Sequence, residues 1–206
     1  MLETLQNLFN LVSGQILPSE EEGPARRAQI IISAALASTG FAALFGLAAG
    51  STELGLAFAN LYKMPMVILL SAVCAVPAGL LAWKLMGGTT RPSNLLMGLA
   101  AGNFSGTLVL AAMAPVVALY YHSSAHLGGT LAMAAVYGGL AVGVLVLVRA
   151  IKQRAGEGAD RWTIGVPATV LLVLQLACLV QFIYIASPIL PELTVFDGGM
   201  DAMLSR

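Results

Sequence analysis

Five apolar stretches, separated by short polar segments, constrain the fold of this chain more than any other feature of its sequence. They cover residues 29–50, 65–86, 94–121, 127–150 and 162–186. The second helix is expected to begin at Pro65, because proline suits the first helical turn, and residues 51–62 are expected to form a loop or interfacial turn. An α-helix rises about 1.5 Å per residue, so about 20 apolar residues cross the roughly 30 Å of hydrocarbon in a bilayer. Only 10% of the 206 residues are charged, whereas a soluble domain usually has about 25%. The sequence therefore predicts an all-α polytopic membrane protein with five transmembrane helices.

A further, amphipathic helix is predicted at the N-terminus, where Pro18 ends it. Its apolar positions recur at helical spacing and comprise Leu2, Leu5, Leu8, Phe9, Val12 and Ile16. Its polar side has no lysine or arginine, which favours docking on protein over attraction to anionic lipid, with insertion into the membrane interface as an alternative. The predicted organisation is an N-terminal helix and linker (1–28), a transmembrane domain (29–188) and an acidic tail (189–206).

The distribution of basic residues predicts the orientation in the membrane. With a cytoplasmic N-terminus, the inner segments hold eight basic residues and the outer segments hold only Lys63 and Arg206. The eight are Arg26, Arg27, Lys84, Arg91, Arg149, Lys152, Arg154 and Arg161. Cytoplasmic loops of membrane proteins are rich in lysine and arginine, so we expect the N-terminus inside and the C-terminus outside.

Glycines four residues apart recur in three of the apolar stretches. Successive glycines at this spacing are rotated by only about 40° on a helix, so they form one smooth stripe on which another helix can lie. The predicted helix-packing interface comprises Gly46, Gly50, Gly98, Gly102, Gly106, Gly139 and Gly143. The pattern leaves open whether these stripes face other helices of the same chain or a partner protein.

No arrangement of residues typical of an enzyme is found in the sequence. There is no GxSxG, P-loop, HExxH or CxxC motif, and no carboxylate pair lies in an apolar stretch. The polar segments are also too short to form a catalytic domain. We therefore expect no enzymatic activity, no cofactor and no nucleic-acid partner.

A few polar side chains are candidates for a specific role. Asn103, Gln175 and Gln181 are amides within apolar stretches, where they either hydrogen-bond between helices or line a path for a substrate. His122 and His126, four residues apart, are weak candidates for a metal site. Two imidazoles without a nearby cysteine or carboxylate are an incomplete ligand set, so a polar loop without a metal is the preferred interpretation.

Several stretches resemble the bacterial Yip-type family of five-span membrane proteins. They are residues 45–50, 63–65 with 69–72, 112–116, 175–177, 186–188 and 190–193. The resemblance implies a five-helix module in a bacterial inner membrane. Eukaryotic relatives of this family act in vesicle trafficking and membrane shaping.

These features favour a non-catalytic structural or accessory subunit of a larger membrane assembly, packed through its glycine-rich helix faces. Its expected partners are membrane lipids together with other membrane protein subunits or further copies of itself. The alternative is a protein that transports a small molecule or a lipid, or shapes the membrane. In that alternative, kinks at Pro77 and Pro115 create an opening that Asn103 and Gln175 line.

Overall fold

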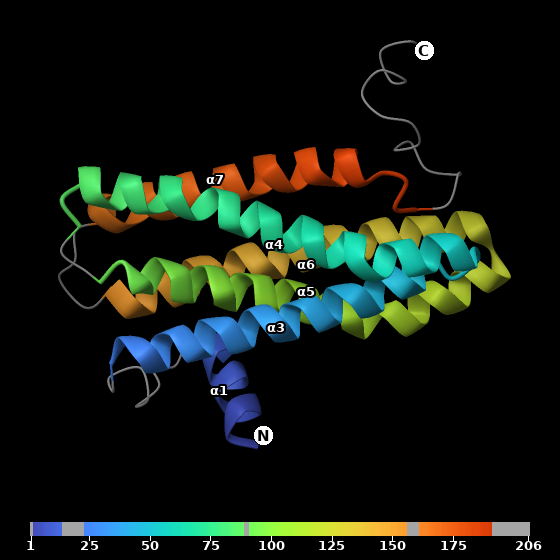
Figure 1. Cartoon of the computed structure of the whole chain (residues 1–206), viewed down its shortest axis with the longest axis horizontal. Helices are drawn as coiled ribbons and strands as arrows, with labels where there is room; N and C mark the ends of the chain where they lie inside the picture. The colour runs from blue at the N-terminus through green and yellow to red at the C-terminus, as the bar shows by residue number, and fades with distance from the viewer. Residues whose placement is uncertain (1, 14–22, 89–90, 156–160, 191–206) are drawn as a thin grey trace, which may run out of the picture.

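The computed structural model describes residues 2–13, 23–88, 91–155 and 161–190, nearly all of them helical (Figure 1). The helices are α1 (Leu2–Ser13), α3 (Pro24–Ala49), α4 (Leu54–Leu85), α5 (Ser93–Ser123), α6 (Ala125–Ala155) and α7 (Arg161–Ala186), and no strand occurs in these ranges. Each of α3 to α7 is long and apolar enough to cross a membrane. The predicted all-α fold with five membrane-spanning helices is thereby confirmed.

The five long helices run side by side along the long axis of the molecule (Figure 1), and their contacts arrange them as an incomplete ring. α3 packs on both α4 and α5, α4 packs on α7, and α5 packs on α6. In contrast, α6 and α7 make few contacts although they follow one another in the chain. α3 therefore joins α4 to α5 on one side of the ring, while only a few contacts join α6 to α7 on the other side.

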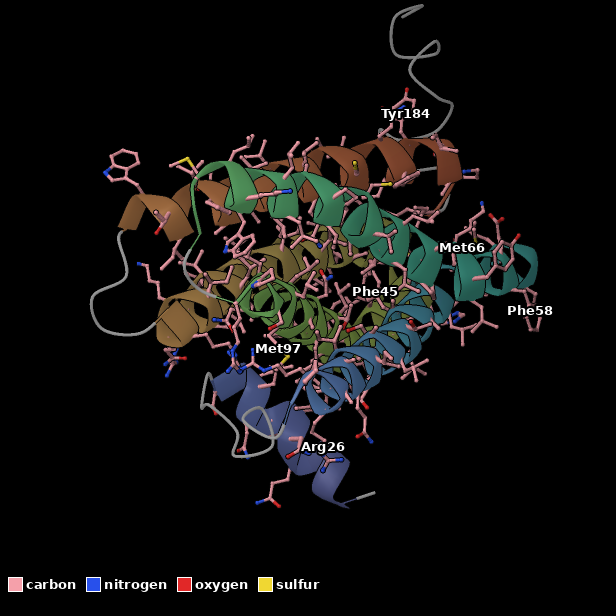
Figure 2. All side chains as sticks on the ribbon, turned by 60° about the vertical axis from the view of Figure 1, so that its left-hand side comes forward. Arg26, Phe45, Phe58, Met66, Met97 and Tyr184 are labelled. Carbon is pink, nitrogen blue, oxygen red and sulfur yellow. The ribbon has the colours of Figure 1, made fainter. Side chains whose placement is uncertain are left out.

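Side chains on the inner and outer faces of this ring differ in exposure but not in polarity. Phe45 and Met97 are fully buried and point into the bundle, whereas Phe58 and Met66 extend outward from α4 (Figure 2). An apolar outer surface would be unfavourable in water and is favourable in lipid. The exposed apolar side chains therefore agree with a membrane location.

The two ends of the bundle differ in charge. One end, called here the basic end, holds Arg27, Lys84 and Arg154, while the opposite end, called here the far end, holds Gly50 and Ser187. The described parts of the chain thus group most of their basic side chains at one end. This grouping matches the loop charges from which the orientation is predicted.

Hydrogen bonds tie three helices together at the basic end. Arg27 Nη1 on α3 donates to Ser93 Oγ at 2.7 Å and to Asn94 Oδ1 at 3.1 Å on α5. Asn94 Nδ2 donates in turn to the main-chain oxygen of Arg154 on α6 at 3.0 Å. These bonds hold the starts of α3 and α5 against the end of α6.

The N-terminal helix α1 docks on the bundle and extends away from α3 (Figure 1). Leu8 and Leu11 are buried in a cluster with Ile30 of α3 and with residues of α5 and α6. Docking on the protein is therefore the observed arrangement. Phe9, predicted on the apolar side, is 58% exposed instead, because the buried stripe is narrower than the pattern indicated. Ile16 lies outside the described residues, as do the rest of the linker through residue 22 and the tail from residue 191.

The second spanning helix begins earlier than predicted, which corrects the interpretation of residues 51–62 as a loop. α4 starts at Leu54, so Pro65 lies inside it rather than in its first turn. A proline at this position leaves only one main-chain oxygen without its usual donor. The preceding turns are held helical by tight packing on α3, in which Ala57 and Asn60 are buried.

Candidate functional site

An elongated apolar cavity of about 270 Å³ lies within the ring of helices. It is enclosed mainly by α4, α5, α6 and α7, and none of the described residues that line it is charged. Small-molecule sites usually measure about 300–1,000 Å³. The lining on α6 extends from Met133 to Leu147, which corresponds to about 21 Å at about 1.5 Å per residue. The cavity is therefore small in volume but long, with its length along the helices.

Glycines from α5 and α6 form part of the cavity wall. A Cβ atom placed on Gly102 would lie 2.8 Å from the main-chain oxygen of Gly143, and one on Gly106 would lie 2.9 Å from that of Gly139. Real Cβ contacts are longer than this, so the two helices approach as closely as they do only because these four positions lack side chains. All four glycines also line the cavity, so the tight contact between α5 and α6 forms part of its wall.

The remaining glycines of the predicted interface also contact other helices of the same chain. Gly46 of α3 packs on Asn60, and a Cβ placed on Gly50, directly after α3, would lie 2.6 Å from the main-chain nitrogen of Ala57. Gly98 of α5 packs on Ile151 of α6. All seven glycines therefore lie between helices of this chain, which answers the question that the sequence left open about their direction.

Two of the predicted polar residues meet across the cavity. Gln175 Nε2 on α7 donates a hydrogen bond of 2.6 Å to Asn103 Oδ1 on α5, and both side chains line the cavity. Gln175 is only 7% exposed. A hydrogen bond of this kind between membrane helices contributes about 0.6 kcal/mol on average. Within the described part of the chain, Asn103 Nδ2 and Gln175 Oε1 have no further partner.

Three buried hydroxyl side chains in the spanning helices are satisfied within their own helix. The hydroxyl groups of Ser38, Ser105 and Thr107 donate to main-chain oxygens three or four residues earlier. Such local bonds are usual for serine and threonine in helices. The amide pair, in contrast, keeps hydrogen-bonding capacity within the cavity lining.

The other predicted polar candidates lie away from the cavity. Gln181 is exposed on α7 and does not line it. His122, near the end of α5, and His126, near the start of α6, are both exposed. Among the described residues, no three histidine, cysteine or carboxylate side chains form a group that could hold a metal ion.

The far end of the cavity is closed by residues 187–190, which follow α7. Ile189 and Leu190 are buried in one cluster with Phe45 and line the cavity. Asn60 Nδ2 holds this segment by donating to the main-chain oxygen of Ile189 at 2.6 Å. Asn60 was missed by sequence reasoning because it falls in the segment predicted as a loop. Its position directly before the second apolar stretch gave no sign of its burial.

A lateral opening lies between α6 and α7. Tyr137 on α6 and Val180 on α7 line the cavity, although 62% and 63% of their surfaces, respectively, are exposed. Residues that face both the cavity and the outside mark its rim. Because both lie well inside spanning helices, the opening faces the lipid.

No protein-family model, curated protein or solved structure matches this chain. The resemblance to the Yip-type family therefore stays a prediction. The fold and the cavity are those of a membrane protein with five spanning helices around an elongated, uncharged cavity that opens to the lipid.

Proposed function

We propose that this protein binds a lipid-like molecule inside the bilayer, in the cavity between α6 and α7. The observation that carries this proposal is the lateral opening, where the exposed Tyr137 and Val180 belong to the lining of the apolar cavity. A molecule dissolved in the bilayer meets this opening directly. The length of the cavity along α6 suits an extended hydrocarbon chain, which moves from the apolar bilayer into an equally apolar space.

This proposal is the lipid-handling alternative considered from the sequence, and it involves binding without catalysis. The role as an accessory subunit has less support. Its predicted means of contact was the set of glycine-rich faces, and Gly102 and Gly106 are occupied by Gly143 and Gly139 of the same chain. Membrane lipids are thus the proposed partners.

The proposed location is a bacterial inner membrane with the basic end toward the cytoplasm. The positive-inside rule supports this orientation, since Arg27, Lys84 and Arg154 share one end. It puts the N-terminus inside and the C-terminus outside. The bacterial assignment depends on the resemblance to the Yip-type family alone.

Filling the cavity tests the proposal. The protein is reconstituted in liposomes containing a hexadecane derivative with a photoactivatable diazirine, and saturable labelling is defined as the part that excess hexadecane removes. Leu140, which lines the cavity from α6, is replaced in Leu140→Trp. Leu145, on the same helix but exposed, is replaced in the control Leu145→Trp.

We expect Leu140→Trp to lose most of the saturable labelling because the indole occupies the space of the chain, while Leu145→Trp labels like the wild type. Helical content and elution volume confirm that both variants are folded. Equal saturable labelling of the two variants, or none in the wild type, would reject the proposed function.

A further inference from the structure

We infer that the bound molecule is an uncharged lipid with a hydrogen-bonding oxygen, and that this oxygen sits against the Asn103–Gln175 pair. This inference depends on the proposed function and specifies its ligand. The chemical class is a long-chain alcohol or carbonyl compound. Its chain lies along α6 and α7, and it enters sideways past Tyr137 and Val180.

The charge of the lining excludes ionic lipids from this position. Every described residue that lines the cavity is uncharged, so a phosphate or ammonium group would be desolvated without a counter-ion. Charged groups are retained in the membrane interior only where they are paired or reach water. A neutral oxygen has no such requirement and needs only a hydrogen bond.

The free groups of the amide pair match an oxygen atom. Gln175 Nε2 already donates to Asn103 Oδ1, which leaves a donor on Asn103 Nδ2 and an acceptor on Gln175 Oε1. An alcohol satisfies both groups, since a hydroxyl donates and accepts, and a carbonyl satisfies the donor. Gln175 is more than nine-tenths buried, so water is a poor competitor for these positions.

The depth of the pair agrees with a neutral ligand. Asn103 lies about 15 Å from the start of α5, and Gln175 lies about 16 Å from the end of α7, at about 1.5 Å per residue. The pair is therefore near the middle of a hydrocarbon layer about 30 Å thick. The charged head group of a phospholipid stays at the interface and cannot reach it, whereas an uncharged oxygen can be carried to this depth.

The closed far end indicates the route of entry. Residues 187–190 cover that end, with Asn60 holding the main-chain oxygen of Ile189. The rim at Tyr137 and Val180 faces lipid instead. A ligand that arrives through the rim comes from the bilayer, where neutral long-chain molecules are dissolved.

Competition between matched ligands tests the inference. Hexadecane, 1-hexadecanol and hexadecyl phosphate are compared at equal mole fractions as competitors of the hexadecane photolabel in wild-type liposomes. We expect 1-hexadecanol to compete at least about threefold more strongly than hexadecane, the factor that one membrane hydrogen bond provides. Hexadecyl phosphate should compete least.

A double variant, Asn103→Leu with Gln175→Met, removes both amides at once. Replacing both partners leaves no unpaired amide, so the variant is expected to fold. It should bind hexadecane as the wild type does but lose the preference for 1-hexadecanol. The control Gln181→Met removes an exposed amide from the same helix and should keep the preference.

The possible failures are distinguishable. Equal competition by the alkane and the alcohol in the wild type, strong competition by hexadecyl phosphate, or an alcohol preference that persists in the double variant would each overturn the assignment of the ligand class. Those results would leave saturable labelling by hexadecane intact. The proposed function itself would be rejected only if the wild type showed no saturable labelling, or if Leu140→Trp did not reduce that labelling.

Discussion

At the scale of single residues, two buried amides determine the character of the cavity. Asn60 is fully buried and Gln175 is 7% exposed, and an amide in such surroundings is costly unless it is hydrogen-bonded. Each finds a partner on another element: Gln175 on Asn103 and Asn60 on the main chain of Ile189. The Gln175–Asn103 bond places polar groups in the apolar cavity lining, and the Asn60–Ile189 bond holds the segment that closes the far end.

Replacing Asn60 should loosen the segment that closes the cavity. Asn60→Leu removes the donor to Ile189 and leaves that buried main-chain oxygen unpaired, which we expect to cost about 1–3 kcal/mol of unfolding free energy. Amide hydrogen exchange at Ser187, Ile189 and Leu190 should rise as well. Unfolding in detergent and exchange measured by mass spectrometry check the two effects.

Lys63→Met is the matched control for Asn60→Leu. Lys63 Nζ donates to the main-chain oxygen of Pro188 at 3.0 Å in the same segment, but this bond is exposed. Exposed substitutions usually change stability by about 0.5 kcal/mol or less. If both variants cost the same, the buried bond of Asn60 is not what holds the segment.

The candidate amides could be found from the sequence, but their pairing could not. Asn103 and Gln175 stand out because amides are rare in apolar stretches, and both line the cavity. Gln181 stands out equally and faces outward. Six residues correspond to about 240° around a helix, so Gln175 and Gln181 point in different directions. Which direction is inward depends on the neighbours of α7, and these are not encoded locally.

At the scale of helices, the close approach of α5 and α6 is the contact most dependent on sequence. Gly102 and Gly106 lie against Gly143 and Gly139 with main-chain contacts. Packing between membrane helices gains little from the hydrophobic effect, because lipid is as apolar as a side chain, so it depends on such close contacts. The pair forms one rigid wall of the cavity.

Gly102→Leu should separate α5 from α6 and destabilise the monomer. The new Cβ would lie 2.8 Å from the main-chain oxygen of Gly143, and overpacking of this kind typically costs about 1–3 kcal/mol. Unfolding of the purified monomer in detergent measures the loss. The control is Gly138→Leu on α6, where nothing lies within 4 Å of the added Cβ. Unchanged monomer stability in Gly102→Leu would contradict the intramolecular role of this glycine.

The extents of the helices were predictable in part. α3 begins at Pro24, five residues before the predicted span and inside the predicted linker, and α6 continues to Ala155, five residues beyond its predicted end. The third and fifth spans begin within one residue of prediction, at Ser93 and Arg161. Pro65 was interpreted as a helix start, since proline suits the first turn. α4 begins at Leu54 instead, because Gly46 and Gly50 allow α3 to pack tightly on its first turns.

At the scale of the whole molecule, the order of helices around the ring creates the cavity. Consecutive elements usually pack together, and α3–α4 and α5–α6 do so. α4 and α5 depart from this rule, since they make few contacts with each other, and so does α7, which packs on α4 and makes only slight contact with α6. The number of spans follows from apolar length, but these departures depend on side-chain fit between distant segments, so the cavity could not be predicted.

Mapping where a membrane-dissolved chain attaches to the protein shows whether the cavity binds lipid inside the bilayer. Wild-type protein in liposomes is labelled with the hexadecane diazirine, and the modified residues are identified by peptide mass spectrometry with and without excess hexadecane. We predict that the saturable sites fall on the cavity lining of α6 and α7, around Leu140 and Leu176. Saturable labelling confined to outward residues such as Leu36 and Leu145, or its complete absence, would contradict an intramembrane binding cavity.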